Sequence, residues 1–214
     1  MLEITEFNSV YLPAQRKAKE PRLMVVLHGL GDSVEGYRFL PNFLGIDDCN
    51  YLLLNAPDQY FTGFSWFDIY ENPEPGILRS RKLLFSLVDE LGTKGFSPEQ
   101  LLFFGFSQGA LMVIDLACRY PAKFLGVFGI SGYVYGVEKY PEEFSDYAQA
   151  QKLCVTHGTH DQVLAIENTR QQISALTKMG LDIRWQEYPK EHTIDPTNEK
   201  QDLVNFYQEI TNSQ

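Results

Sequence analysis

Residues 101–114 read LLFFGFSQGALMVI, and this stretch decides the fold. An apolar run is followed by a G-x-S-x-G turn at 105–109 and then by apolar residues with helical spacing. A strand, a tight turn and a helix in this order hold a serine at the start of the helix, where free backbone N–H groups favour a developing negative charge. Ser107 is therefore the predicted nucleophile. The alternative is an ordinary glycine-flanked turn in which Ser107 only caps the helix.

On both sides of this stretch, short apolar runs alternate with longer segments of helical spacing. The pattern is typical of a parallel sheet covered by helices on both faces. It predicts strands at 23–27, 51–54, 101–104, 124–130, 152–156 and 183–188, and helices at 78–91, 108–119, 164–179 and 202–210. Two irregular stretches, 58–76 and 132–148, follow strands, and in this architecture such loops carry ligand sites.

A single domain over residues 1–214 is the organisation that length and composition favour. Hydrophobic residues make up 44% of the chain and charged residues 21%, and the formal net charge is -10. That charge repels nucleic acid and anionic lipid, and no apolar run approaches the ~20 residues of a membrane span. The three cysteines lack metal-type spacing and fit reduced thiols. We therefore expect a cytoplasmic protein with no nucleic-acid partner, no stable membrane insertion and no metal site.

The four histidines are the first candidates for the base, because a serine hydroxyl needs a partner that is partly unprotonated near neutral pH. His28 lies upstream of the serine, and His157 and His160 lie near the end of the strand at 152–156. His192 alone lies between the last predicted strand and the last helix, where the base belongs in proteins with this motif. We predict His192 as the general base; the alternative is a solvated loop histidine.

The acid of the triad should lie on the loop after the next-to-last strand, and Asp161 occupies that loop. Two alternatives stay open. Asp161 can instead cap the helix that follows it, and Asp182 can serve as the acid from near the next strand. Asp182 comes just after a helix-ending glycine and so at the wrong end of its strand. His160 is expected to be a loop residue, because its side chain should diverge from that of its neighbour Asp161.

Two backbone N–H groups are predicted to bind the oxyanion of the tetrahedral intermediate. One belongs to Gln108, the residue after the nucleophile. The other is assigned to Leu30, in the loop His28-Gly29-Leu30-Gly31, because the glycines allow the backbone to turn its amides inward. The alternative is a plain exit from the strand.

Five motifs in order cover nearly the whole chain: LHGLGD at 27–32, SWFDI at 65–69, GFSQG at 105–109, HGTHDQV at 157–163 and YPKEH at 188–192. Together they resemble the phospholipase/carboxylesterase family of small α/β-hydrolases, which includes acyl-protein thioesterases and bacterial carboxylesterases. The resemblance implies a single-domain α/β-hydrolase fold with a mostly parallel central sheet, helices on both faces and no large cap domain. It also implies the triad Ser107, Asp161 and His192, the oxyanion donors Leu30 and Gln108, and Trp66 beside the substrate cleft.

The residues together predict a serine esterase that hydrolyses carboxylic esters through an acyl-enzyme, with no cofactor. Thioesters and lysophospholipids differ only in the leaving group. Expected partners are a small-molecule ester, an acylated protein or lysophospholipid, and a second copy of the chain in a homodimer. The alternatives are a serine peptidase or amidase of the same fold, and a non-catalytic ligand-binding protein of the α/β-hydrolase fold.

A modest apolar cleft is expected for the acyl group, because the predicted strands and helices use most of the chain. Its predicted lining is Leu30, Phe64, Tyr133 and Val163, besides Trp66. Each methylene placed in such a cleft gains about 0.8 kcal/mol until the space is full. We therefore expect short to medium acyl chains to be preferred.

Overall fold

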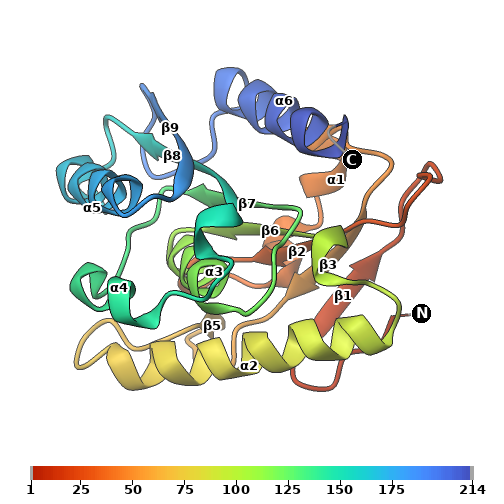
Figure 1. Ribbon diagram of the computed structural model, residues 1–214, viewed down its shortest axis with the longest axis horizontal. Helices are drawn as coiled ribbons and strands as arrows, with labels where there is room; N and C mark the ends of the chain where they lie inside the picture. The colour runs from red at the N-terminus through yellow and green to blue at the C-terminus, as the bar shows by residue number, and fades with distance from the viewer. Residues whose placement is uncertain (1, 213–214) are drawn as a thin grey trace.

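The computed structural model describes residues 2–212 and has a central sheet with helices on both sides (Figure 1). The strands of this sheet are β1 (Ser9–Leu12), β2 (Leu23–Leu27), β3 (Asn50–Leu54), β6 (Leu101–Phe106), β7 (Gly126–Ile130), β8 (Lys152–Gly158) and β9 (Asp182–Tyr188). Their spatial order is β1-β3-β2-β6-β7-β8-β9. The edge strand β1 runs antiparallel to β3, and the other neighbours are parallel.

Helices cover both faces of the sheet. One face carries α2 (Glu74–Thr93), α3 (Gln108–Arg119), α4 (Tyr140–Glu143) and α5 (Ile166–Lys178), and the other carries α1 (Leu40–Leu44) and α6 (Asn198–Asn212). Short 3-10 helices lie at Val34–Tyr37, Pro98–Gln100, Val137–Lys139 and Ala148–Ala150. In the described residues no helix has the length and apolar character that crossing a membrane requires.

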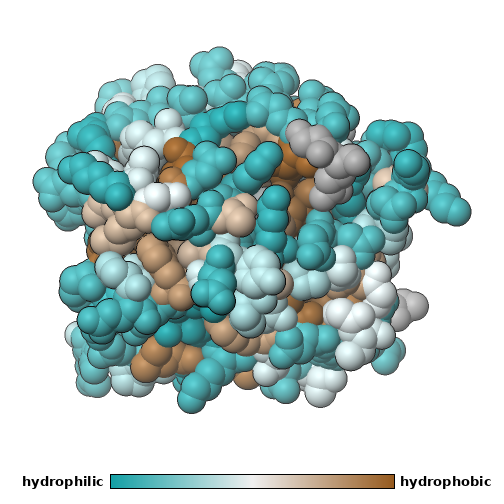
Figure 2. Space-filling model, viewed as in Figure 1, coloured by the Kyte–Doolittle hydropathy of each residue, from teal (hydrophilic) through white to brown (hydrophobic). Residues whose placement is uncertain are grey.

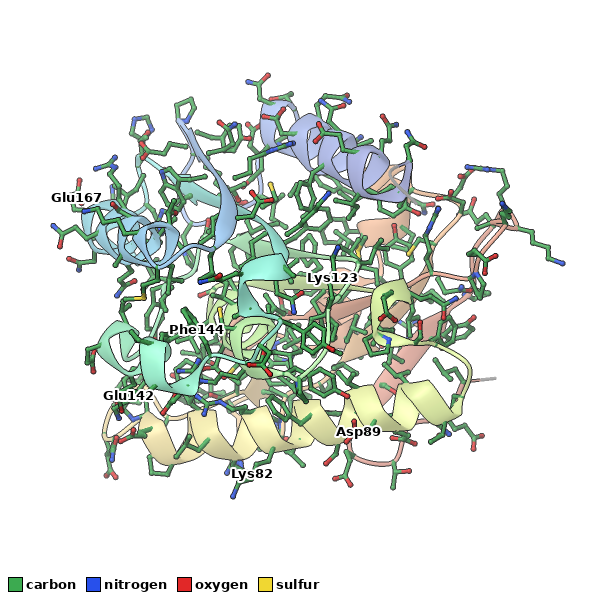
Figure 3. All side chains as sticks on the ribbon, in the orientation of Figure 1. Lys82, Asp89, Lys123, Glu142, Phe144 and Glu167 are labelled. Atoms are coloured by element: carbon green, nitrogen blue, oxygen red, sulfur yellow. The ribbon has the colours of Figure 1, made fainter. Side chains whose placement is uncertain are left out.

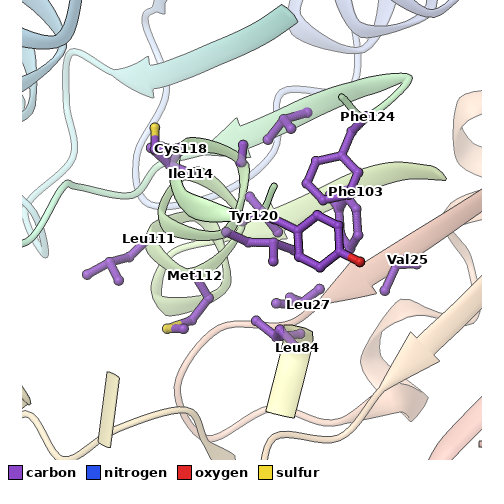
Figure 4. Close-up of a cluster of buried hydrophobic side chains, with 14 of the residues drawn as sticks. Val25, Leu27, Leu84, Phe103, Leu111, Met112, Ile114, Cys118, Tyr120 and Phe124 are labelled. Atoms are coloured by element: carbon purple, nitrogen blue, oxygen red, sulfur yellow. The ribbon is translucent and has the colours of Figure 1, made fainter. Parts of the chain in front are cut away.

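The apolar runs of the central strands are continuous because both faces of the sheet are covered. All five residues of β2 are buried. Successive side chains point to opposite faces, so Val25 packs with Phe103 against α3, whereas Val26 packs with Phe104 on the side of α6. Figure 4 shows Val25, Leu27 and Phe103 beside Met112 of α3.

The helices differ in how much of their surface is covered. Every residue of α3 is buried, because the helix lies between the sheet and its neighbours α2 and α4. In contrast, α2 buries one stripe that includes Leu84 and Leu91, and Lys82 points outward from it (Figure 3). Hydrophilic residues cover most of the face in Figure 2, which includes this outer side of α2.

All six predicted strands and all four predicted helices are present. The strand at 23–27 and the helix at 108–119 have the predicted bounds, and the other elements have shifted ends. The strand predicted at 124–130 begins at Gly126. The helix predicted at 78–91 begins earlier, at Glu74, because proline is tolerated in a first helical turn. The edge strand β1 was not predicted. The stretch at 58–76 is less irregular than expected, since β4 (Asp58–Tyr60) and β5 (Gly63–Ser65) form a hairpin. These strands are too short to show an alternating pattern.

Candidate active site

Backbone packing positions Ser107 between β6 and α3. Its φ is 54°, in the left-handed region, and its N–H donates to the carbonyl oxygen of Ile130 at 2.9 Å. A Cβ on Gly105 would lie 2.2 Å from the carbonyl oxygen of Gly109, and one on Gly109 would lie 2.2 Å from that of Leu27. The turn therefore has no room for a side chain at either glycine, and it presents Ser107 at the carboxyl end of the sheet.

The three predicted triad residues lie in one hydrogen-bonded line. The Nε2 atom of His192 is 3.0 Å from Ser107 Oγ, and Nδ1 of the same ring is 2.7 Å from Asp161 Oδ2. The residues follow β6, β8 and β9, and the carboxyl ends of these parallel strands meet at one edge of the sheet. This arrangement suits a neutral imidazole that donates from Nδ1 to the carboxylate and accepts at Nε2 from the serine hydroxyl.

The two oxygens of the Asp161 carboxylate bind different partners. Oδ2 faces His192, whereas Oδ1 accepts hydrogen bonds of 2.9 Å each from the N–H groups of Val163 and Leu164. Burial raises the pKa of this carboxyl, but the hydrogen bonds from Leu164, His192 and Val163 outweigh burial and hold the pKa below its usual value. Asp161 is thus ionised at neutral pH, and its turn-forming bonds orient it toward the histidine.

The competing candidates lie elsewhere. Asp182 is exposed and pairs in register with Lys152 at the start of β8 and β9, far from the carboxyl ends of these strands. The exposed His160 donates its backbone N–H to Lys190. His157 is buried with Nδ1 3.9 Å from Asp161 Oδ2, and burial lowers its pKa. In His28, Nε2 accepts from the N–H of Ala56, so this ring supports the neighbouring loop.

The predicted oxyanion donors both have a free N–H. Within residues 2–212, the backbone N–H groups of Leu30 and Gln108 donate to no other group of the chain. Both residues line the hollow into which Ser107 opens. A Cβ on Gly29 would lie 3.3 Å from Ser107 Cβ, so the loop that carries Leu30 closely approaches the nucleophile. The two free donors meet the requirement for oxyanion binding.

The buried side chain of Gln108 has a supporting role that the sequence did not indicate. Its Oε1 accepts from the N–H of Trp66 at 3.1 Å and from Ser65 Oγ at 3.3 Å, and its Nε2 donates to the carbonyl of Phe67 at 2.9 Å. These bonds fasten the segment 65–67 to the start of α3. The sequence signal was limited to the position of Gln108 after the nucleophile.

The prediction that Trp66 lies beside the substrate is wrong. Its side chain is fully buried in the core, 5.9 Å from the ring of Phe7, and its Nε1 donates to the carbonyl of His28 at 2.9 Å. Phe64 also lies outside the hollow, with its N–H bonded to Asp32 and its ring 6.4 Å from that of His28. Both aromatic residues support the oxyanion loop from behind instead of lining the cleft.

A mostly apolar hollow of about 410 Å³ opens from Ser107 and His192. Of the predicted lining residues, Leu30, Tyr133 and Val163 line this hollow. Four residues that the sequence did not suggest also line it: Asp32, Ile69, Phe106 and Leu164.

A second hollow of about 280 Å³ also contacts the histidine. It shares Asp32, Phe106 and His192 with the first. Its other lining residues are mainly aromatic or small: Gly36, Tyr37, Phe39, Phe43, Thr193 and Ile194. The two hollows therefore adjoin at the three residues that they share.

A buried ion pair holds the loop that carries His192. The Lys190 ammonium donates to Glu199 Oε1 at 2.5 Å and to the carbonyl of Thr193 at 2.8 Å. The side chains of Lys190 and Glu199 are 3% and 0% exposed, and Glu199 also accepts from Thr156 of β8. Burial lowers the pKa of Lys190. The sequence did not indicate this ion pair, because nothing local reveals that the lysine turns inward.

Cys49, Cys118 and Cys154 are free and buried, and burial raises the pKa of Cys49 and of Cys154 to about 12. These thiols are unsuited to act as nucleophiles. Within residues 2–212 no group of three or more His, Cys, Asp or Glu side chains could hold a metal ion.

Comparisons with known proteins identify the family. Residues 12–210 match the family described as Phospholipase/Carboxylesterase. Acyl-protein thioesterase 1 of Aspergillus fumigatus is 28% identical over 218 aligned positions, covering 90% of this chain and 89% of that protein. An Oryza sativa protein named "Probable inactive carboxylesterase" is 26% identical over 196 positions, covering 83% of this chain and 80% of its own.

The fold is shared with solved structures. The crystal structure of esterase PE8 superposes with a TM-score of 0.85 at 24% identity, covering 96% of this chain and 100% of that one. That likeness shows the α/β-hydrolase fold, and the family match spans most of the chain. The chain therefore belongs to the phospholipase/carboxylesterase family of α/β-hydrolases and is a serine hydrolase.

Proposed function

We propose that this protein is a carboxylesterase in which Ser107 is the nucleophile, His192 the general base and Asp161 the orienting acid. The observation that carries the proposal is the line of contacts of 3.0 Å from Ser107 Oγ to His192 Nε2 and 2.7 Å from His192 Nδ1 to Asp161 Oδ2. A base held by a third group against a hydroxyl is the arrangement that activates serine.

In the first half of the proposed reaction, Ser107 Oγ attacks the ester carbonyl while His192 Nε2 takes the hydroxyl proton. The negative charge on the carbonyl oxygen is bound by the free N–H groups of Leu30 and Gln108. The intermediate then collapses: the bond to the leaving group breaks, His192 returns the proton to that group, and the acyl group stays on Ser107.

In the second half, water replaces the leaving group. His192 takes a proton from the water, which attacks the acyl carbonyl, and then returns a proton to Ser107 Oγ as the acid departs. The ionised Asp161 stabilises the imidazolium that forms in each half. It also keeps the neutral ring in the tautomer that carries its proton on Nδ1. Neither step requires a metal or an organic cofactor.

A carboxylic ester is the substrate class that we favour. A hollow of about 410 Å³, lined mostly by apolar side chains, suits an acyl group of modest size. Thioesters and lysophospholipids undergo the same acyl transfer with another leaving group. The relative with thioesterase in its name makes an acylated protein a second candidate substrate.

Labelling with a fluorophosphonate, followed by intact mass measurement, tests this function. We expect one added phosphonyl group in the native protein, none in Ser107→Ala, and no effect of EDTA on ester hydrolysis. An unlabelled protein without hydrolysis would favour a non-catalytic binding role. Labelling combined with turnover of amides in preference to esters would favour the peptidase or amidase alternative.

A further inference from the structure

The smaller hollow lies where a leaving group would depart. It contacts His192, the residue that returns a proton to the leaving group, and it shares Asp32 and Phe106 with the larger apolar hollow. With the acyl group in the larger space, the alcohol part of the ester has the smaller one available. This assignment rests on the function proposed above.

Asp32 gives both hollows a negative charge. No Lys or Arg belongs to either lining. Asp32 Oδ1 accepts the N–H of Ser33 at 2.7 Å, and within residues 2–212 its carboxylate forms no ion pair. The neighbouring carboxylate of Glu35, in contrast, pairs with Arg38 at 2.6 Å. A carboxylate without an ion pair in the lining of both hollows disfavours a phosphate-bearing leaving group and favours a cationic one.

Aromatic rings form a large part of the smaller hollow, together with Gly36, Thr193 and Ile194. Phe39 and Phe43 meet edge to face with 5.5 Å between centroids, and Tyr37 lies 6.3 Å from Phe39. The Lys200 ammonium lies 5.4 Å from the centre of the Phe43 ring, so this cluster already accepts a cation of the chain itself. Aromatic faces together with a carboxylate are a recurring way to bind ammonium groups.

We propose that the hollow formed by Asp32, Tyr37, Phe39, Phe43 and Phe106 binds the alcohol part of the substrate and selects small alcohols that carry an ammonium group. The larger hollow takes the acyl part. Selection acts on the leaving group alone, so the chemistry at Ser107 is the same for all esters.

Three butyrate esters that differ in the charge of the alcohol test the proposal. They are butyrylcholine, its uncharged isostere 3,3-dimethylbutyl butyrate, and the anionic 2-(phosphonooxy)ethyl butyrate. At low salt we expect kcat/KM for the choline ester to exceed that for the isostere by about three- to tenfold, with the anionic ester lowest. Added salt should reduce the differences, because it screens the charge of Asp32.

Asp32→Asn should bring the ratio of choline ester to isostere to about one. Its matched control is Asp68→Asn, because Asp68 is also exposed, also accepts a backbone N–H through Oδ1, and lies outside both hollows. Phe39→Leu should lower the ratio as well, whereas Tyr147→Leu should not: the two rings are 48% and 46% exposed, and Tyr147 lies outside both hollows.

The outcomes separate this proposal from the function on which it rests. Hydrolysis of the isostere without preference for the choline ester, or a preference that Asp32→Asn retains, overturns the leaving-group assignment and leaves the esterase intact. An equal reduction of the ratio of choline ester to isostere in Asp32→Asn and Asp68→Asn would also overturn it, since the effect would then come from overall charge. Absence of both hydrolysis and fluorophosphonate labelling overturns both proposals.

Discussion

Two segments that meet at the candidate site are held in place by different means. The turn around Ser107 is fixed by backbone, since Gly105 and Gly109 let neighbouring carbonyls approach to distances that exclude a Cβ. The loop around His192 is fixed by charged side chains, with Lys190 bonded to Glu199 and to the carbonyl of Thr193. The position of Ser107 thus depends on close packing, and the position of His192 depends on a buried ion pair.

This difference predicts different vulnerabilities. Backbone packing neither titrates nor exchanges partners, so the serine should keep its place over a wide range of conditions. A buried ion pair is costly to break, because removal of one partner leaves the other charge without compensation. The histidine loop is therefore the segment in which substitutions outside the triad should reduce catalysis.

The largest effect on kcat is expected from substitution of Ser107 or His192, where the two segments touch. Ser107→Ala and His192→Ala should each lower kcat by about 10³–10⁶-fold, because residues of a triad act as a unit. Asp161→Asn should cost the same or less. Ester hydrolysis measures the effect, and circular dichroism checks that the variants are folded. More than a tenth of the activity remaining in Ser107→Ala would contradict the assignment of the nucleophile.

A smaller effect is expected from the ion pair. Lys190→Met leaves the buried Glu199 carboxylate without an opposite charge, which should lower the free energy of unfolding by about 3–5 kcal/mol. Loss of the contact with Thr193 should displace His192 and lower kcat by about 10–100-fold, with a smaller change in KM.

Two further variants separate loop positioning from stability. Lys190→Met combined with Glu199→Leu removes the stranded charge, so stability should recover while kcat stays low. Arg170→Met is the matched control, because Arg170 pairs with Glu187 at 2.8 Å on the surface, where a pair contributes up to about 1 kcal/mol. A Lys190→Met protein that is folded and keeps the native kcat would refute the positioning role.

The same contrast explains what the sequence could predict. The turn at Ser107 was predictable because its serine and its two glycines lie within five neighbouring residues, where each constraint leaves a mark on the residue type. The carbonyls of Leu27 and Ile130 that pack against the turn are distant in sequence. The pairing of Lys190 with Glu199 was not, because it joins a loop to a helix across Thr156 of β8. In sequence, both charged residues look like ordinary solvated ones.

Trp66 shows the same limit, in a residue that the sequence placed incorrectly. Its motif did not show which side of the loop 28–31 the ring occupies, and the ring lies in the core. That side depends on Phe7 and on the carbonyl of His28, both distant in sequence. The fold was predictable from apolar runs in the central strands, whereas β1 and the β4–β5 hairpin lack such runs.

A third prediction concerns acid stability near the histidine. The pKa of Asp161 in the folded protein lies below its ordinary value of 3.8, so the unfolded chain binds the proton first as the pH falls. The resulting stabilisation is complete above about pH 4–5 and is lost as the pH falls through the folded pKa. The free energy of unfolding of Asp161→Asn should therefore fall less steeply as the pH is lowered. The difference in slope should correspond to less than one proton taken up on unfolding. Urea unfolding between about pH 5 and 2 measures the slopes, and equal slopes would contradict this prediction.

The smallest effect is expected at the rim of the larger hollow, where neither close packing nor a buried pair holds the residues. For p-nitrophenyl esters from acetate to palmitate, kcat/KM should rise by up to about fourfold per methylene and then level or fall, because each buried methylene gains about 0.8 kcal/mol until the space is full. Ile69→Ala should flatten the rise by removing part of the apolar wall. Leu78→Ala should not, since Leu78 is similarly exposed, 40% against 44%, but lies outside the hollow. Below the micellar limits, a steady increase through palmitate, or strong activation at a lipid interface, would instead indicate a long-chain deacylase.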